Sequence, residues 1–517
     1  MSQWRLNIIF IFLGSSLFGF TQNIDEIFGN SGVIYFSFDF DSKNKLNQLS
    51  KFISIDHKTN PFKAYAYANK SEFENFLKFG IDYELVDESI DLKASNHNRS
   101  SWDYYPTYSE YVSMMQSFAD SFPTICKLHN IGNLSSGREI LILQISDSVG
   151  LKENEPSFLY TSSMHGNELT GYVLMLRLID ELLTGYGTNS KYTNLINQVD
   201  IWINPLANPD GAYNGGDENM IDYAKRYNAN FIDLNRNFPD PFDGDHPDGN
   251  EWQEETIIFM DLADSIPFNM SCNIHTGAEV FNYPWDMWNN LTADDDWWQY
   301  VARAYVDTLY NYSSNYFTLF NNGITNGADW YEIHGGRQDF MNYFNYCREF
   351  TLEMSNEKIP NPNDLPGLWD ANAASLVNYI EQSLFGLRGL ITDSITGSPL
   401  QARVEILTHD IDSSHVYSNL PVGNYHRYLS QGNYDITFSK NGYSSKTINK
   451  DIYTNLATVL DVQLAPLSTV GLIEDKKPKA IINSYDVLGR SGTNKNNGVV
   501  IHLFDDGSAE KIIITNK

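Results

Sequence analysis

Two histidines and a glutamate have the types and spacing of a metal site. His165 stands three residues before Glu168, between an expected strand at 158–160 and an apolar-periodic helix, so the imidazole and the carboxylate fall on one side. His-x-x-Glu alone often occurs by chance, but His275 ends a second expected strand, 270–275, at the edge where open α/β sheets bind ligands. Two histidines and one carboxylate leave a fourth tetrahedral position for water, which is typical of catalytic zinc. The three residues therefore predict a zinc hydrolase.

Such a hydrolase also needs a base for the water, a cation for the developing oxyanion and groups that define the substrate. Polar motifs that could supply them follow the first ligand pair in the same region. They are NPDG (208–211), DLNRNFP (233–239) and TLE (351–353). A surface turn held by a salt bridge would explain such a motif on its own, but their order along the chain favours one site.

Three longer segments carry a family resemblance. They are RYNANFIDLNRNFPD (226–240), GITNGADWY (323–331) and TLEMSNEK (351–358). In order, spacing and motif, residues 102–466 resemble the zinc metallocarboxypeptidases, most closely the subfamily that contains carboxypeptidases D, E, M and N. The resemblance implies a carboxypeptidase-like fold and one zinc ion per chain, held by His165, Glu168 and His275.

Position by position, the resemblance also implies catalytic and substrate-binding roles. Glu353 would be the general base, which takes a proton from the water and delivers it to the leaving amine. Arg226 would polarise the scissile carbonyl and stabilise the oxyanion. Asn235 and Arg236 would clamp the terminal carboxylate of the substrate, which makes the enzyme an exopeptidase. Tyr331 matches the family tyrosine that closes over the substrate.

The pocket for the terminal side chain is implied in the same way. Asp286 stands where an aspartate of the subfamily selects basic ends, and Gln338 matches a second, polar pocket position. A preference for C-terminal lysine or arginine is therefore expected. Two residues depart from the family pattern: Arg337 replaces a usually apolar residue, and Thr276 stands where glycine is usual. A second cation near the pocket could weaken selection for cationic ends.

Two other functions remain open. A related zinc amidohydrolase would act on acyl-amino acids or peptidoglycan peptides, but the presence of Asn235, Arg236 and Tyr331 argues against it. A metal-free peptide-binding relative would have lost its ligands, whereas all three ligands and Glu353 are present here. Both alternatives are therefore less favoured than a carboxypeptidase.

The elements that must position these residues lie between 101 and 385. Apolar runs alternate there with amphipathic stretches, which predicts an α/β catalytic domain with a mixed central sheet and helices on both faces. From 386 to 466, short alternating runs between Gly-Asn and Asn-Gly turns predict a β-sandwich, and this segment resembles the transthyretin-like domain of the subfamily.

Two further modules flank this region. Residues 23–100 are expected to form a small α/β domain, with strands at 33–38, 64–68 and 81–85, a helix at 46–53 and a second helix opened by a capping box of Ser71 and Glu74. A polar linker follows at 94–101, where Arg99 could be cut. This module is either a propeptide or a permanent accessory domain.

The tail, 467–517, has strand candidates at 480–487, 499–504 and 511–515. It resembles the C-terminal sorting domain of type IX secretion, which implies the type IX machinery as a partner and export from a Gram-negative bacterium to the surface or medium. The alternative is a fibronectin-like adhesion module.

Composition limits the remaining possibilities. A chain of 517 residues with 42% hydrophobic residues predicts two to four domains. Its 35 basic and 65 acidic residues give a formal charge of −30, which disfavours nucleic acid as a partner. Residues 1–22 combine Arg5 with an apolar run, as in a signal peptide, and no transmembrane anchor is expected in the mature chain. Three cysteines allow at most one disulfide, and buried thiols are the favoured interpretation.

Overall fold

The computed structural model describes residues 24–28, 32–56, 62–86, 102–215, 221–467, 479–486, 490–491, 498–505 and 507–514. The expected signal peptide at 1–22 and the linker at 94–101 lie outside these ranges. The chain divides into two compact units, 1–465 and 466–517. Within the described ranges, no helix has the length and apolar character needed to cross a membrane.

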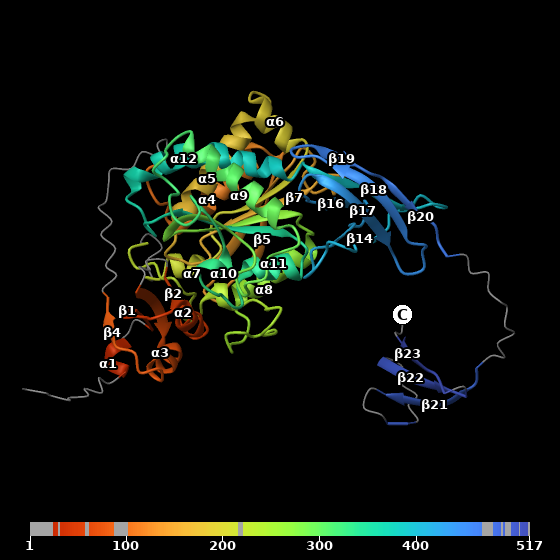
Figure 1. The fold of residues 1–517 in the computed structure, drawn as a ribbon, viewed down its shortest axis with the longest axis horizontal. Coiled ribbons are helices and arrows are strands. Elements are labelled where there is room, and N and C mark those ends of the chain that lie inside the picture. Colours follow the sequence, from red (N-terminus) through yellow and green to blue (C-terminus); the bar gives the residue numbers. More distant parts are fainter. Residues whose placement is uncertain are drawn as a thin grey trace, which may run out of the picture. The chain divides into compact units, whose positions relative to one another are not determined.

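A mixed eight-stranded sheet organises the centre of the first unit (Figure 1), in the order β11-β10-β12-β9-β7-β8-β6-β5. The strands are β5 (Cys126–Asn133), β6 (Glu139–Ile145), β7 (Ser157–Ser162), β8 (Asp200–Asn204), β9 (Met270–His275), β10 (Ala278–Tyr283), β11 (Ile324–Asn326) and β12 (Arg348–Ser355). The inner strands β12, β9, β7 and β8 run parallel to one another, whereas β6 and β5 are antiparallel. Every residue of β7, β8, β9 and β12 is buried, as expected for a sheet covered on both faces.

Helices cover both faces of this sheet, as predicted (Figure 1). One face packs against α4 (Tyr108–Ser121), α5 (Thr170–Gly185), α9 (Asp295–Tyr310) and α12 (Leu365–Gln382) in the largest apolar core. The other face packs against α8 (Glu254–Ser265) and α11 (Arg337–Tyr343). The shorter helices are α6 (Ser190–Ile196), α7 (Pro209–Ala212), α10 (Gly327–Trp330), η1 (Leu234–Arg236) and η2 (Pro362–Asp364).

A small antiparallel sheet forms the N-terminal part of the same unit, in the order β2-β3-β1-β4. Its elements are α1 (Ile24–Phe28), β1 (Val33–Asp39), α2 (Lys43–Leu49), β2 (Ser54–Ile55), β3 (Lys63–Asn69), α3 (Lys70–Leu77) and β4 (Tyr83–Leu85). The helix expected at 46–53 starts earlier, because the Ser42 side chain accepts the N–H of Lys45. The expected capping box was also misplaced, since Asn69 and Glu72 form it.

The C-terminal part of the first unit contains two sheets that share one apolar core. One consists of β13 (Gly386–Asp393), β16 (Asn424–Arg427), β19 (Ala457–Val459) and β20 (Val462–Leu464). The other consists of β14 (Arg403–Glu405), β15 (Val416–Tyr417), β17 (Gly432–Ser439) and β18 (Lys446–Ile452). Two packed sheets agree with the predicted sandwich.

A buried ion cluster joins these sheets to the central one. Asp294, at the start of α9, accepts hydrogen bonds from Arg427 at 2.6 and 2.9 Å and from Arg348 at 3.0 Å. Although burial opposes the charge, Arg427 holds the pKa of Asp294 well below its usual range. The carboxylate therefore stays ionised and ties β12 to β16.

The second unit holds an antiparallel sheet of β21 (Ile481–Asp486), β22 (Gly498–Phe504) and β23 (Ala509–Ile514). These strands begin and end within two residues of the three tail candidates. The three cysteines, all in the first unit, are buried free thiols. Burial raises the pKa of Cys126 to about 12 and that of Cys272 well above its usual value.

Candidate active site

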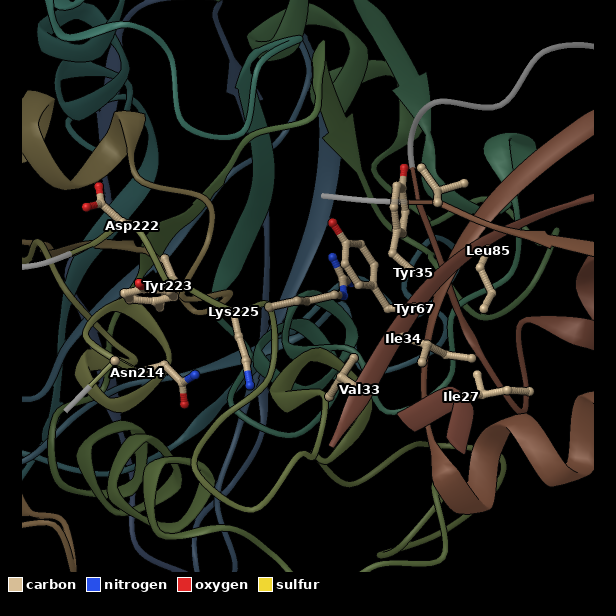
Figure 2. Close-up of a pocket in the computed structure, with 14 residues that line it drawn as sticks. Ile27, Val33, Ile34, Tyr35, Tyr67, Leu85, Asn214, Asp222, Tyr223 and Lys225 are labelled. Carbon is tan, nitrogen blue, oxygen red and sulfur yellow. The ribbon is translucent and has the colours of Figure 1, made fainter. Parts of the chain in front are cut away.

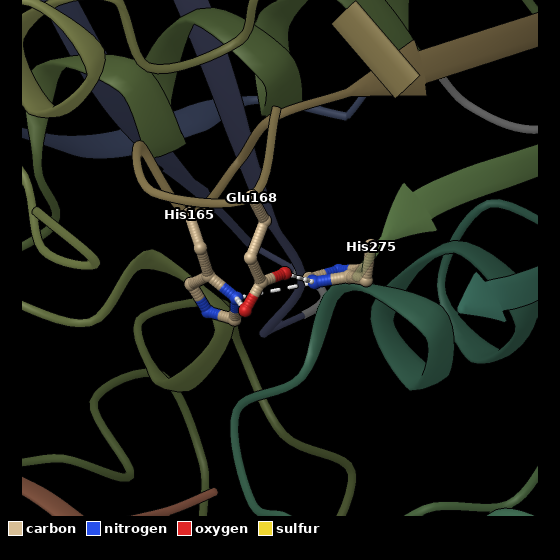
Figure 3. A group of neighbouring side chains, drawn as sticks. All are labelled: His165, Glu168 and His275. Carbon is tan, nitrogen blue, oxygen red and sulfur yellow. Dashed lines mark hydrogen bonds and ion pairs between the residues drawn. The ribbon is translucent and has the colours of Figure 1, made fainter. Parts of the chain in front are cut away.

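His165, Glu168 and His275 converge on one point (Figure 3). Nδ1 of His165 lies 3.0 Å from Oε1 of Glu168, Nδ1 of His275 lies 2.8 Å from Oε2, and the two Nδ1 atoms are 3.1 Å apart. Tetrahedral zinc with bonds of about 2.0–2.2 Å would separate its ligand atoms by roughly 3.3 Å, so the donor set fits that ion closely. Against the effect of burial, the two histidines hold the pKa of Glu168 well below its usual range, and an ionised carboxylate is what a metal requires.

The other ring nitrogen of each histidine has a polar partner. Nε2 of His165 lies 3.0 Å from Oδ1 of Asp233, and Nε2 of His275 lies 2.8 Å from the Asn273 carboxamide. Such partners fix the orientation of a ligating imidazole and leave Nδ1 facing the metal position. No motif pointed to a role for Asn273, and the one signal for Asp233 was its position two residues before Asn235.

Secondary structure brings the ligands and Glu353 together. His165 and Glu168 lie between β7 and α5, and His275 is the last residue of β9. Strand β12 runs parallel to β9 in a register that pairs Glu353 with His275. Gly166 is required in the ligand loop, because a Cβ there would collide with the backbone of Gly211. Glu353 thus enters the site from the strand next to a ligand.

Arg226 lies against the ligand set. Its Nη1 donates to Oε1 of Glu168 at 3.1 Å, and its Nε donates to Oδ2 of Asp233 at 3.0 Å. Despite burial, Asp233 and Glu168 raise the pKa of this guanidinium. A permanent positive charge is therefore held beside Glu168 and the two histidines.

Arg236 lines the same small pocket as His165, Arg226 and His275, and some of its hydrogen-bond donors are unused there. Its Nη1 donates to the backbone oxygen of Asn235 at 2.8 Å, while Nε and Nη2 are buried with no hydrogen-bond acceptor among the described residues. The Asn235 side chain accepts the N–H of Arg337 at 2.9 Å, which fixes its carboxamide. Buried donors of a guanidinium are rarely left without a partner. The arrangement suits a carboxylate supplied by a ligand.

Asp286 also lines this pocket, and two side-chain amides donate hydrogen bonds to its carboxylate. Its Oδ1 accepts hydrogen bonds from Asn282 and Gln338, both at 3.0 Å. Burial raises the pKa of Asp286 to about 6. Asn282 also lines the pocket. It was not predicted, because it belongs to none of the motifs that indicated the site.

Arg337 does not add a cation to this pocket. Its side chain is buried, with Nη2 3.0 Å from Oε2 of Glu349 and Nη1 hydrogen-bonded to Thr161. The other departure from the family pattern, Thr276, donates its hydroxyl to the backbone oxygen of Lys358 at 2.9 Å. The prediction that Arg337 could weaken the binding of cationic ends was therefore wrong, because its charge is paired with Glu349.

Most of the predicted site residues share one pocket. Glu168 and Gln338 lie directly behind its wall, and eight others line it: His165, Arg226, Asn235, Arg236, His275, Asp286, Tyr331 and Glu353. The volume left inside is only about 20 Å³, roughly the room that one water needs. A peptide has no space to enter this form of the site.

The N-terminal sheet contacts the residues around the pocket. The Tyr331 hydroxyl donates to the backbone oxygen of Ile55 at 3.2 Å, and the Ser54 hydroxyl donates to Oδ2 of Asp233 at 2.5 Å. Asp56 lies 3.2 Å from Nζ of Lys358, which is itself 3.7 Å from Oε1 of Glu168. Residues 54–56 thus contact Tyr331 of the pocket and two residues next to His165 and Glu168, although they do not themselves line the pocket.

A larger cavity of about 530 Å³ lies farther out between the N-terminal sheet and the segment 221–226 (Figure 2). Ile34, Tyr35 and Tyr67 form one wall, and Tyr223 and Lys225 belong to the other. Arg226 lines both this cavity and the small pocket, but neither the three ligands nor Glu353 lines the cavity.

Comparisons with known proteins agree with this arrangement. The description "zinc carboxypeptidase" belongs to the family whose pattern matches residues 111–375. Carboxypeptidase D of Rattus norvegicus is 32% identical over 420 residues, which cover 78% of this chain and 30% of that protein. Carboxypeptidase M of Mus musculus is 34% identical over 351 residues, covering 64% of this chain and 77% of that protein. Mouse carboxypeptidase N catalytic chain is 32% identical over 394 residues, covering 69% and 85%.

Solved structures show the same fold. Carboxypeptidase A from Helicoverpa armigera aligns with a TM-score of 0.53 at 20% identity, covering 68% of this chain and 97% of that one. Thrombin-activatable fibrinolysis inhibitor aligns with a TM-score of 0.52 at 15% identity, covering 68% and 98%. This chain spans less than a third of the length of carboxypeptidase D, but most of carboxypeptidases M and N. The chain belongs to the zinc carboxypeptidase family.

Proposed function

We propose that this protein is an exported zinc carboxypeptidase that hydrolyses the last peptide bond of peptides or proteins, with a preference for C-terminal lysine or arginine. The observation that carries the exopeptidase assignment is Arg236, whose buried Nε and Nη2 have no acceptor among the described residues. A free C-terminal carboxylate would satisfy both donors at once. An internal peptide bond offers no such group.

The side chains have separate tasks. His165, Glu168 and His275 would hold one zinc ion, which when bound supplies Lewis acidity and lowers the pKa of a water from about 15.7 towards ~7. Glu353 takes the proton of the attacking water and passes it to the leaving amine. Arg226 bears the charge that develops on the carbonyl oxygen. Asn235 and Arg236 hold the terminal carboxylate, and Tyr331 closes over the substrate.

The preference for basic ends follows from Asp286. Its buried carboxylate lies in the same pocket as Arg236, so a terminal residue bound through its carboxylate would extend its side chain towards Asp286. Asn282 and Gln338 both bond Oδ1. A lysine ammonium or arginine guanidinium would pair with the charge that remains.

We assign the rest of the chain as follows. Residues 1–22 are a signal peptide, 23–100 a propeptide-like domain, 101–385 the catalytic domain, 386–466 a transthyretin-like sandwich and 467–517 a sorting domain for type IX secretion. The protein would then be secreted or surface-bound in a Gram-negative bacterium. The contacts of residues 54–56 with Asp233, Tyr331 and Lys358 support a propeptide that blocks substrate entry until the linker is cut.

One experiment tests the activity. The full chain is treated with an immobilised protease that cuts the linker, the protease is removed, and peptides differing only in the terminal residue are added with and without a chelator. We expect release of single C-terminal residues, fastest for lysine and arginine, and no release after chelation. Cleavage of amidated peptides or of acyl-amino acids alone would instead indicate an amidohydrolase. Peptide binding without hydrolysis would indicate a non-catalytic relative.

A further inference from the structure

A second carboxylate stands directly behind Asp286. Asp339, in the first turn of α11, is 1% exposed and accepts the backbone N–H of Asp286 at 3.0 and 3.1 Å and that of Met287 at 2.9 Å. The side chain of Asp286 is thus held by Asn282 and Gln338, and its backbone by Asp339. Both ends of the residue are fixed.

Gly327 packs directly against the carboxylate of Asp286. A Cβ on Gly327 would overlap Oδ1 of Asp286, so the carboxylate fills the space against that glycine. Its second oxygen, Oδ2, lies 3.7 Å from the position that a Cβ on Gly336 would take, on the side of Asn235. A shift of the Asp286 backbone would therefore change where the charge points.

The two carboxylates also share one electrostatic environment. Burial first, and then the Asp286 carboxylate, raise the pKa of Asp339 well above its ordinary value. Asp240 also raises the pKa of Asp339, and Glu353 raises that of Asp286, whereas Arg236 lowers the pKa of Asp286. Arg337 is neutralised by Glu349. A cation entering the pocket would relieve this repulsion.

We propose that Asp339 is a positioning residue that determines specificity: it holds the backbone of Asp286 in place, so that the Asp286 carboxylate can receive a lysine or arginine side chain. This inference rests on the proposed carboxypeptidase activity with basic preference. Asp339 does not line the pocket. It acts through Asp286 rather than by touching the substrate.

The test compares Asp339→Asn, Asp286→Asn and the double variant with the wild type, each as full chain cut in the linker as above. Asn keeps one oxygen that can accept the N–H of Met287 but loses the second oxygen, which accepts the N–H of Asp286. Asp261→Asn, an exposed carboxylate on α8, is the matched control. Substrates are peptides ending in lysine, arginine or leucine, and the inhibitors lysine and norleucine report binding alone.

We expect Asp339→Asn to raise KM for lysine and arginine ends by roughly 10-fold to 100-fold, the range for a displaced binding group, with kcat and the leucine peptide within twofold. In the Asp286→Asn background the same substitution should change KM less than twofold, because residues that act as a unit are not additive. Inhibition by lysine, but not by norleucine, should weaken in parallel.

Other results would overturn the proposal. An equal loss for leucine and lysine ends would make Asp339 a purely structural residue, and additive effects would separate it from Asp286. If Asp286→Asn itself left the preference for basic ends unchanged, the proposed specificity would fail while the carboxypeptidase activity stood. Thermal unfolding shows whether Asp339→Asn is folded. If it is not, Asp339→Ser, whose hydroxyl can also accept a hydrogen bond, is tested in its place against the same outcomes.

Discussion

The hydroxyl of Tyr331 donates a hydrogen bond to the backbone oxygen of Ile55, 3.2 Å away in the N-terminal sheet. The residue expected to close over a substrate is therefore held by the N-terminal sheet. Ser54, next to Ile55, binds Asp233 in the same interface. Release of this sheet would free the tyrosine and open the pocket together.

The first prediction concerns this contact. Ser54→Ala with Asp56→Ala removes the bonds to Asp233 and Lys358, so the uncut chain should gain carboxypeptidase activity relative to wild type. Hydrolysis of a lysine-ended peptide before and after linker cleavage measures the gain. Ser71→Ala, at an exposed position of α3, is the control. Equal activity of cut and uncut wild-type chain would contradict a blocking role.

The second prediction concerns pH and the same interface. Burial raises the pKa of Glu72 from its ordinary value of 4.5 to about 8, while its Oε2 accepts the Tyr227 hydroxyl at 2.9 Å. A raised carboxyl pKa favours the docked state fully below pH 4.5, and this advantage is lost as pH rises to about 8. After linker cleavage, size-exclusion chromatography should find more released N-terminal fragment at pH 8 than at pH 5.

Glu72→Gln should flatten that pH dependence, since the amide keeps an acceptor but does not titrate. Glu74→Gln, an exposed neighbour, should leave it unchanged. A release profile that is the same for wild type and Glu72→Gln would assign the effect to another group.

The third prediction separates metal binding from proton transfer. Glu353→Gln should lower kcat by roughly 10²–10⁴-fold, the usual contribution of a general base, while zinc content by atomic absorption stays at one per chain. Glu279→Gln, a partly buried glutamate of β10 that does not line the small pocket, should retain activity. Loss of zinc from Glu353→Gln would make Glu353 a ligand instead.

The fourth prediction concerns selectivity and pH. Because the pKa of Asp286 is raised to about 6, its charge is present above that pH and is lost as pH falls through it. KM for a lysine-ended peptide should therefore rise below about pH 6, whereas KM for a leucine-ended peptide should not. Parallel profiles for the two peptides would place the titration elsewhere.

The fifth prediction concerns stability. Asp294→Ala leaves Arg348 and Arg427 buried without their shared carboxylate, so the free energy of unfolding should fall by about 3–5 kcal/mol. Urea unfolding measures the loss. Asp296→Ala, an exposed residue of the same helix, should change it by less than about 0.5 kcal/mol.

The sequence predicted the strands best where apolar runs were bounded by turns. Strand 270–275 was placed to the residue, although Asn273 and His275 are polar residues in a strand that is buried throughout. The capping box at α3 was shifted by two residues, since Ser71 and Asn69 both satisfy the local rule and only the backbone geometry distinguishes them. Local patterns locate elements more accurately than their exact ends.

Site residues that belong to a sequence motif could be predicted, whereas residues placed by tertiary packing could not. Ordered motifs pointed to His165, Glu168, His275 and Arg236, which the fold brings close together. Asn282 and Asp339 both contact Asp286, but neither contact follows from a motif. Arg337 is the opposite case. Its place in the sequence suggested a cation in the pocket, whereas its partner Glu349 lies in β12 and draws the side chain inside.

The three cysteines have a consequence for where the protein can work. Cys126, Cys272 and Cys347 are buried and unpaired, and burial keeps the thiols of Cys126 and Cys272 protonated at neutral pH. Only the thiolate is readily oxidised or exchanged. The described fold of the first unit therefore does not depend on the redox state of its surroundings. It has no disulfide for a reductant to break and no reactive cysteine for an oxidant to link.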